Sequence, residues 1–330
     1  MNAFEYAIAD SFPSAAAFLA ERKPGEALVK AGGIDVLDRL KERIEAPRVV
    51  LSLHPVARPS PPVASDADGT IVIHALTRLA ELAADPLVRE RLPALADAAD
   101  EAATPQVRNM ATVGGNLCQK PRCWYFRSQD FTCLKKGGST CYAVEGDNRY
   151  HAIFGAGACH IVHPSNLAIP LLAYNAQLVL VKQADGKLAE RTVAADEFFR
   201  VPTDPTNDEH TLAPGELIRE IRIAKADAGL HSAYVEIGHK QSYDWALAAC
   251  AVNLNDPGKP RVVLGHVAPI PWRLPAVEKL LANQSLSDPL VAKCKEMALA
   301  GAKPMRRNGY KTQLVGAALE RALRAAAGAA

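Results

Sequence analysis

The feature that most constrains this chain is its uneven distribution of cysteine. The chain has seven cysteines, and five of them fall between Cys118 and Cys159. Its first residues, MNAFEYAIADSFPS, contain neither the basic region nor the apolar region of a secretion signal. In a chain without an export signal, clustered cysteines favour metal ligation over disulfides. The fold is therefore expected to contain a cysteine-rich loop that closes around a metal centre.

Four of the clustered cysteines are the candidate ligands. Cys123, Cys133, Cys141 and Cys159 are separated by 9, 7 and 17 residues, and Cys118 lies just upstream. Structural zinc sites usually contain closely spaced cysteine pairs, and only Cys118 and Cys123 approach that pattern. Irregular spacing on a long loop suits a [4Fe–4S] cluster, which needs four thiolates at the corners of a cube. Zinc and unligated thiols are the alternatives. Cys250 and Cys294, in apolar surroundings, are expected to be buried structural thiols.

The first of two glycine pairs follows a short apolar run. Ala27–Lys30 is predicted to be a strand and Asp35–Ile44 an amphipathic helix, with Gly32 and Gly33 at the turn between them. Glycines at such a turn allow close approach of a ligand, and the free N–H groups of a helix start favour anionic oxygens. Asp35 can cap the helix or accept a ligand hydroxyl. A plain turn with a capping aspartate is the alternative.

The second glycine pair lies about 80 residues further on, in the sequence ATVGGN. Thr112 offers a hydroxyl, Gly114 and Gly115 are expected to offer exposed N–H groups, and Asn116 offers an amide. A plain glycine turn is again the alternative. Two such loops can converge on one extended dinucleotide. Neither matches the G-x-G-x-x-G or P-loop pattern, so a Rossmann or Walker fold is not supported.

The remaining pattern indicates a mixed α+β chain of three parts. We expect the divisions 1–57, 58–226 and 227–330, with the cysteine-rich insertion at about 117–160. Ser165 is expected to cap a helix over Leu167–Tyr174, and Asp185-Gly186 to form the turn of a hairpin. After residue 230, three strand-like runs precede an Ala-rich helical tail, which predicts a C-terminal α+β domain with a three-stranded sheet.

The motifs KAGGIDVL (30–37), ATVGGN (111–116) and HPSN (163–166) resemble the FAD-binding medium subunit of the xanthine dehydrogenase and aldehyde oxidoreductase family. The resemblance extends from about residue 4 to about residue 320. It implies a two-subdomain FAD-binding fold similar to that of vanillyl-alcohol-oxidase flavoproteins, followed by the family's flavoprotein C-terminal domain. Ile34 stands where the family usually has Thr, and Asn166 where it usually has Asp. Each difference removes an option for hydrogen bonding or charge near the flavin.

The resemblance also implies a set of FAD contacts, and it assigns no catalytic residue. The implied contacts are Lys30, Ala31, Gly32, Gly33, Ile34, Asp35, Val36 and Leu37 in the first segment, Ala111, Thr112, Gly114, Gly115 and Asn116 in the second, Ser165, Asn166 and Leu167 in the third, and Lys240 and Tyr243 near the C-terminus.

The cysteine-rich segment resembles an insertion found in one branch of that family. This branch includes the periplasmic aldehyde oxidoreductases and 4-hydroxybenzoyl-CoA reductase, and its insertion carries [4Fe–4S]. The resemblance implies Cys123, Cys133 and Cys141 as ligands, with Cys159 as the fourth and Cys118 as its competitor. Basic residues crowd the insertion and can offset an anionic cluster, although a solvated polar loop is the alternative.

The function implied is electron transfer within a heteromeric molybdenum hydroxylase that oxidises aldehydes or N-heterocycles. A molybdopterin-binding large subunit and a [2Fe–2S] small subunit are the implied partners, and electrons leave from FAD to an external acceptor. The alternatives are a stand-alone flavin-dependent oxidoreductase of the same fold and a zinc-stapled scaffold without redox activity.

Charge and hydropathy argue against a nucleic-acid-binding or membrane-spanning protein. Lys plus Arg exceed Asp plus Glu by only two, 38 against 36, so no strong field favours nucleic acid or an anionic membrane. The sequence contains no apolar run of about 18 residues, so no membrane-spanning helix is predicted. We therefore expect a cytoplasmic protein without direct membrane insertion. Export to the periplasm would require a partner that carries a signal.

Overall fold

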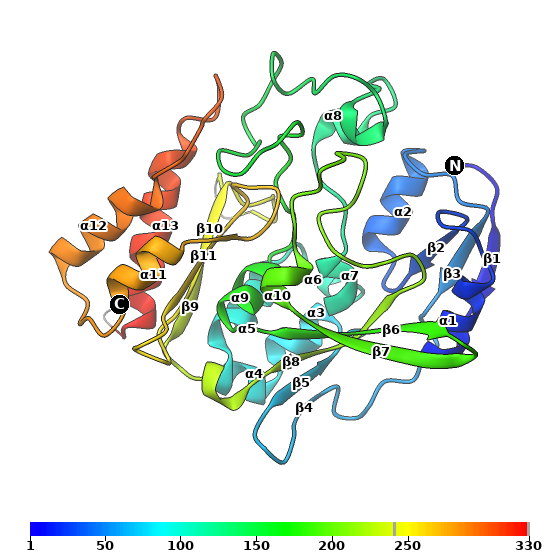
Figure 1. The fold of residues 1–330 in the computed structure, drawn as a ribbon, viewed down its shortest axis with the longest axis horizontal. Coiled ribbons are helices and arrows are strands. Elements are labelled where there is room, and N and C mark those ends of the chain that lie inside the picture. Colours follow the sequence, from blue (N-terminus) through cyan, green and yellow to red (C-terminus); the bar gives the residue numbers. More distant parts are fainter. Residues whose placement is uncertain (240–241, 329–330) are drawn as a thin grey trace.

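The described part of the chain forms three β-sheets that follow one another from the N-terminus to the C-terminus (Figure 1). The computed structural model describes residues 1–239 and 242–328. The first sheet is parallel and has the order β1 (Glu5–Ile8), β3 (Val49–Ser52), β2 (Ala27–Lys30). Its strands alternate with α1 (Phe12–Ala20) and α2 (Ile34–Lys41). Parallel neighbours need such crossover helices, which explains the alternation.

The second sheet is antiparallel and lies at the centre of the molecule. Its order is β4 (Val63–Ser65), β5 (Ile71–His74), β8 (Leu217–Ile223), β6 (Gln177–Ala184), β7 (Lys187–Ala194). Asp185 and Gly186 both have positive φ, 49° and 73°, as the predicted two-residue hairpin between β6 and β7 requires. Ile71, Ile73 and Ile221 are fully buried on one face of this sheet, against the helices of the same part of the chain.

Short helices and 3₁₀ turns follow one another between residues 79 and 227, both beside the central sheet and within the cysteine-rich segment. They are α3 (Leu79–Ala84), α4 (Pro86–Arg91), α5 (Pro93–Glu101), α6 (Pro105–Arg108), α7 (Val113–Leu117), α8 (Trp124–Arg127), the 3₁₀ turn η1 (Leu134–Lys136), α9 (Ala168–Ala173), α10 (Ala195–Phe198) and the 3₁₀ turn η2 (Lys225–Asp227). The N-terminus of α3 is closed by a side chain of its own first turn. Arg78 is its N-cap, and Glu81 accepts a hydrogen bond from the Arg78 backbone N–H at 2.9 Å.

The third sheet is antiparallel, with the order β12 (Trp272–Arg273), β11 (Arg261–Gly265), β10 (Ala248–Asn253), β9 (Ser232–Ile237). The sequence predicts three strands here. The fourth, β12, is only two residues long and gives no pattern. One face packs against α11 (Pro275–Leu281) and α13 (Lys311–Ala326), with α12 (Asp288–Ala298) against these two helices, and the opposite face packs against α5 and α9. The central and C-terminal sheets therefore share a core.

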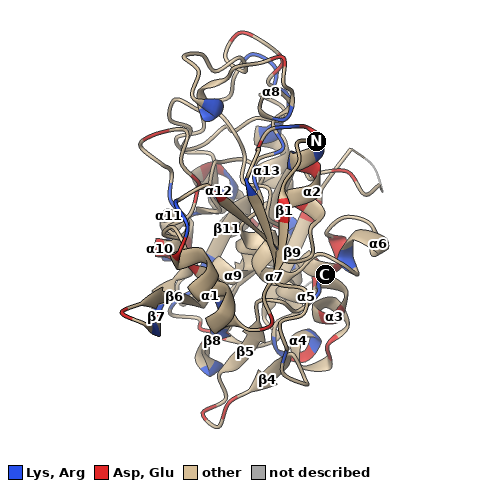
Figure 2. Cartoon of the chain, turned by 90° about the vertical axis from the view of Figure 1, so that its right-hand side faces the viewer, with Lys and Arg blue, Asp and Glu red and all other residues tan. Residues whose placement is uncertain are grey.

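Helix length and charge distribution can be compared with the expectations for membrane-spanning and nucleic-acid-binding proteins. In the described part of the chain, every helix is too short or too polar to cross a membrane. Figure 2 shows acidic and basic residues interspersed along the chain, in agreement with the small net charge of +2.

Candidate functional site

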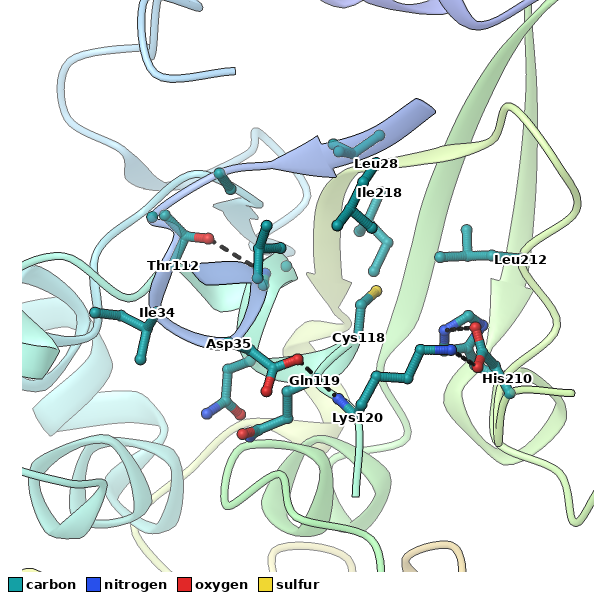
Figure 3. A pocket seen from close by; sticks show the side chains of 18 of the residues that line it. Leu28, Ile34, Asp35, Thr112, Cys118, Gln119, Lys120, His210, Leu212 and Ile218 are labelled. Carbon is teal, nitrogen blue, oxygen red and sulfur yellow. Dashed lines mark hydrogen bonds and ion pairs between the residues drawn. The ribbon is translucent and has the colours of Figure 1, made fainter. Parts of the chain in front are cut away.

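A cavity of about 1320 Å³ lies between the first sheet, the central sheet and the C-terminal part of the chain. Drug-sized ligands usually occupy pockets of about 300–1000 Å³, so this cavity suits a larger ligand such as a dinucleotide. Both glycine segments line it, as Figure 3 shows for Ile34, Asp35 and Thr112. Segments some 80 residues apart in sequence therefore reach one site.

The first segment is the turn from β2 into α2. Gly33 is the N-cap of α2 and has φ 84°, a left-handed conformation that side chains disfavour. Among the described residues, the backbone N–H groups of Gly32, Gly33 and Ile34 donate to no protein acceptor. Unpaired N–H groups at a helix start are ready to bind an anion. This turn fits a diphosphate.

The second segment differs from the prediction. The glycines lie inside the short helix α7 rather than in a loop, and Thr112 is its N-cap. The N–H of Gly114 donates to the Ala75 carbonyl at 2.8 Å, and that of Gly115 donates to Thr112 Oγ1 at 3.2 Å. The expectation that these N–H groups are free is wrong, because capping uses one and the contact with Ala75 uses the other. Their value to a ligand is the absence of a side chain.

The two glycine segments also touch each other. A Cβ added to Gly32 would lie 1.9 Å from the Met110 carbonyl oxygen, which no packing allows. Gly32 therefore permits backbone contact between the first segment and the residue just before the second. This contact holds the two sides of the cavity together.

The third segment supports the second through Asn116. Asn116 Oδ1 accepts hydrogen bonds from Ser165 Oγ at 2.5 Å and from the Leu167 N–H at 3.4 Å. Its amide Nδ2 is left for a ligand oxygen, since no acceptor for it is seen among the described residues. Ser165 Oγ also accepts from the Ala168 N–H at 3.1 Å, so it binds the first N–H of α9, whose N-cap residue is Leu167 rather than the predicted Ser165.

Asn166 points to a carboxylate that the sequence analysis did not single out. Its Nδ2 donates to Glu236 Oε2 at 2.7 Å, and the Tyr234 hydroxyl donates to the same oxygen at 2.7 Å. Burial raises the pKa of Glu236 to about 7, against the lowering effect of these hydrogen bonds. Glu236 lines the cavity as a group able to hold a proton near neutral pH. It lies in a strand without a motif, so no sequence signal marks it.

Most of the predicted FAD contacts line the cavity, and a minority do not. Those on its wall are Ala31, Gly32, Gly33, Ile34, Asp35, Val36, Ala111, Thr112, Gly114, Gly115, Asn116, Asn166 and Tyr243. Lys30, Leu37, Ser165 and Leu167 are absent from the wall. Lys240 lies outside the described residues. Arg122 and Trp245 are wall residues that the sequence analysis did not assign to FAD.

Asp35 is engaged by the cysteine-rich segment. Its Oδ1 lies 2.7 Å from Arg127 Nη2 and 2.9 Å from Arg122 Nη2, and its Oδ2 accepts from the Lys120 N–H at 3.1 Å (Figure 3 shows the last contact). Burial alone would raise the pKa of Asp35, but the charges of Arg122, Arg127 and Arg39 outweigh it and lower the pKa. Gly33 is the N-cap of α2, and among the described residues no side-chain hydrogen bond caps this helix.

The candidate metal ligands surround a second, much smaller cavity of about 10 Å³. Cys123, Cys133, Cys141 and Cys159 all line it, together with the rings of Tyr125, Phe126, Tyr142, His151 and His160. His151 Nε2 lies 3.2 Å from Cys123 Sγ. Within residues 1–239 and 242–328, no three His, Cys, Asp or Glu side chains converge closely enough to hold a single metal ion.

Cys118 is separate from this group and lies on the wall of the large cavity instead (Figure 3). Burial raises its pKa to about 12. Cys250 and Cys294 are fully buried in the C-terminal core, as expected from their apolar surroundings.

The basic residues of the cysteine-rich segment are largely paired with carboxylates. Lys135 Nζ lies 2.5 Å from Glu209 Oε1, and Lys120 pairs with Asp208. Arg122 and Arg127 pair with Asp35 and Asp38. These side chains are therefore neither unpaired charges nor residues of a solvated loop. Their ion pairs connect the segment to both sides of the large cavity.

The fold and the cavity together suit a protein that binds an extended dinucleotide. Residues 2–225 match the family model described as the FAD binding domain in molybdopterin dehydrogenase. Residues 233–326 match the CO dehydrogenase flavoprotein C-terminal domain. Several relatives cover nearly the whole chain, and solved structures share its fold.

The aldehyde oxidoreductase FAD-binding subunit PaoB of Escherichia coli is 35% identical over 95% of this chain and 95% of its own length. The carbon monoxide dehydrogenase medium chain of Hydrogenophaga pseudoflava is 29% identical over 98% of this chain and 96% of its own. A solved carbon monoxide dehydrogenase from H. pseudoflava, which lacks the Mo-pyranopterin moiety, superposes with a TM-score of 0.75 at 27% identity, covering 99% of this chain and 98% of that one.

The chain therefore belongs to the FAD-binding medium subunits of the molybdenum hydroxylase family. It is an oxidoreductase subunit that binds FAD and works as part of a heteromeric complex.

Proposed function

We propose that the chain passes electrons from a partner subunit to an external acceptor through FAD held in the large cavity, and that it carries a [4Fe–4S] cluster. Bound FAD supplies a centre that stores two electrons and releases them to an acceptor. The single observation that carries the FAD site is the convergence of both glycine segments on one cavity large enough for a dinucleotide.

The residues of the cavity have different roles in this proposal. The N–H groups of Gly32, Gly33 and Ile34 would hold the diphosphate at the start of α2. Asn116 Nδ2 would donate to a further FAD oxygen. Gly115 would leave room for the ligand, since its position has no side chain beside Thr112.

A substitution at Gly115 tests this site. Gly115→Val would put a Cβ 2.9 Å from Thr112 Oγ1 and block the cavity wall. We expect FAD content after purification to fall at least tenfold. Gly309→Val is the matched control, because no atom lies within 4 Å of a Cβ at that position. Full FAD occupancy in folded Gly115→Val protein would contradict the assignment of this segment.

The cluster proposal rests on the four thiols that line one cavity. A [4Fe–4S] cube holds four thiolates at separate corners, whereas a zinc ion draws its ligands to one point. The cavity of about 10 Å³ has room for roughly one water molecule, so the four side chains must move apart to admit a cluster.

The two disputed cysteines give a matched test. Cys159 lines the small cavity and Cys118 does not. We expect Cys159→Ser to lose the cluster signal in low-temperature EPR of the reduced protein and to lower its iron content. Cys118→Ser should keep about four irons per chain. The reverse outcome would make Cys118 the ligand, and colourless protein with bound zinc would support the scaffold alternative instead.

The relatives support the partners and the substrate that we propose. The name of PaoB, an aldehyde oxidoreductase FAD-binding subunit, supports an aldehyde as the substrate of the complex. We propose a molybdopterin-binding large subunit as the site of aldehyde oxidation and a [2Fe–2S] small subunit as the electron carrier to FAD. The compartment proposed is the cytoplasm, unless a partner with a signal carries the assembly across the membrane.

A further inference from the structure

We propose that the cysteine-rich segment completes the FAD site by neutralising Asp35 through Arg127 and Arg122. This inference rests on the proposed FAD site and does not depend on which metal the segment holds. It starts from an electrostatic conflict in the first glycine segment. The start of α2 is the place for a diphosphate, yet Asp35 brings a carboxylate into the first turn of the same helix.

Two arginines that are distant from Asp35 in the sequence neutralise its carboxylate. Arg127 Nη2 and Arg122 Nη2 lie 2.7 and 2.9 Å from Asp35 Oδ1. The side chains are only 11% exposed for Asp35 and Arg127 and 20% exposed for Arg122, so solvent screens these pairs weakly. Arg39, one helical turn along α2, is 3.0 Å from Asp35 Oδ2 and adds a third positive charge.

The arginines are themselves held in place by the cysteine-rich segment. Arg127 Nε donates to the Pro121 carbonyl at 2.8 Å, and its Nη2 donates to the Lys120 carbonyl at 2.9 Å. Its Nη1 also donates to Asp38 on α2 at 2.9 Å. The guanidinium of Arg127 therefore ties one stretch of the segment to two carboxylates of the FAD-binding helix.

Arg122 extends this connection to the C-terminal part of the chain. Its guanidinium carbon lies 4.6 Å from the ring centroid of Trp245, and both residues line the large cavity. A cation over an indole face is a favourable contact. Three parts of the chain, α2, the cysteine-rich segment and the stretch around Trp245, thus meet at Arg122.

Two consequences follow. Without the arginines, the Asp35 carboxylate would remain uncompensated and would repel the FAD diphosphate. Binding energies are reciprocal, so an ordered cysteine-rich segment raises FAD affinity and bound FAD in turn stabilises the segment. Arg127 and Arg122 act through Asp35 and are positioning residues.

The test titrates FAD into the flavin-depleted full chain and measures Kd by flavin fluorescence. Arg127→Gln should raise Kd about tenfold or more, because charge-assisted hydrogen bonds in a weakly solvated site are lost. Asp35→Asn removes the carboxylate that needs compensation, so adding it to Arg127→Gln should restore most of the affinity. Asp35→Asn alone should bind FAD at least as tightly as the unaltered chain. Arg222→Gln is the control, because Arg222 pairs with Glu220 on the central sheet and does not line the cavity.

The outcomes separate this inference from the proposed FAD site. Failure of the unaltered chain to bind FAD would contradict the site itself. An unchanged Kd in Arg127→Gln, or a loss of affinity that Asp35→Asn does not restore, would overturn only the neutralising role. If Arg127→Gln fails to fold, Asp35→Asn decides alone: an affinity at least equal to that of the unaltered chain supports the proposal, and a large loss overturns it. Iron content, measured in every variant, shows whether the metal site has changed as well.

Discussion

At the scale of single residues, two buried histidines carry a cost that depends on pH. His163 and His266 are 5% and 2% exposed, and burial lowers the pKa of each to about 3. In the unfolded chain both would titrate near 6.5. Because the pKa of each ring is lower in the folded than in the unfolded state, its contribution to the free energy of unfolding is complete above pH 6.5. That contribution is lost as the pH falls toward 3.

We therefore expect acid to weaken the fold through these residues. On going from pH 7.5 to pH 5, each histidine should lower the free energy of unfolding by about 2 kcal/mol. His163→Asn keeps an acceptor for the Ser165 N–H, which donates to His163 Nδ1 at 3.3 Å, and removes the titrating ring. Urea unfolding of His163→Asn at both pH values should show a change in unfolding free energy that is smaller by about that amount than in the unaltered chain. The exposed His54→Asn is the control, and equal pH effects in the two variants would refute this account.

The same scale shows what residue patterns can and cannot predict. The sequence marks Asp35, Asn116 and Cys159 as functional candidates, because their chemistry and their place beside glycines or cysteines are local facts. It does not predict that Asp35 would pair with Arg127, since the two are 92 residues apart and only the folded chain brings them together. Glu236 is missed for the same reason: its partners Asn166 and Tyr234 define it, and no motif surrounds it.

At the scale of elements, the loop before β8 is joined to the cysteine-rich segment by a buried ion pair. Lys135 Nζ lies 2.5 Å from Glu209 Oε1, and the two side chains are 2% and 8% exposed. Lys135 also donates to the Asn207 carbonyl at 2.8 Å. Burial raises the pKa of Glu209, and the charge of Lys135 opposes that shift. A buried carboxylate without this partner would be strongly destabilising.

Lys135→Met should lower the unfolding free energy by about 3 kcal/mol, because it leaves Glu209 buried and unpaired. Adding Glu209→Gln should recover part of that loss, since the second change removes the uncompensated charge. Urea unfolding followed by circular dichroism measures both variants. The matched control is Lys187→Met at the exposed hairpin of β7. A loss in Lys135→Met no larger than in Lys187→Met would show that the pair adds nothing to stability.

Elements with a regular pattern could be predicted, and short ones could not. The bounds Ala27–Lys30 of β2 agree with the sequence, because an apolar run between turn residues marks a strand. The helix α7 was missed, since five residues that include two glycines have low helix propensity. Capping by Thr112 and the contact between Gly114 and Ala75 hold it instead. The two-residue strand β12 gives no periodicity at all.

At the scale of the whole molecule, the large cavity is the feature that unites the fold. Residues of the first sheet, the central sheet and the C-terminal part all reach its wall, so none of these parts holds the complete site alone. The family resemblance predicted the mixed fold, FAD binding and membership of a complex, and the matched family models and relatives confirm them. The proposed division at residues 57 and 226 stays a prediction.

The most direct test of the account measures flavin reduction by substrate under anaerobic conditions. An aldehyde that bleaches the flavin absorbance of the assembled complex is added to the isolated, FAD-loaded chain at the same concentration. The account predicts rapid bleaching in the complex and an unchanged, oxidised flavin spectrum in the isolated chain, because substrate oxidation takes place on a partner. Bleaching of the isolated chain at the rate of the complex would contradict it, and the protein would be a self-sufficient flavin oxidoreductase.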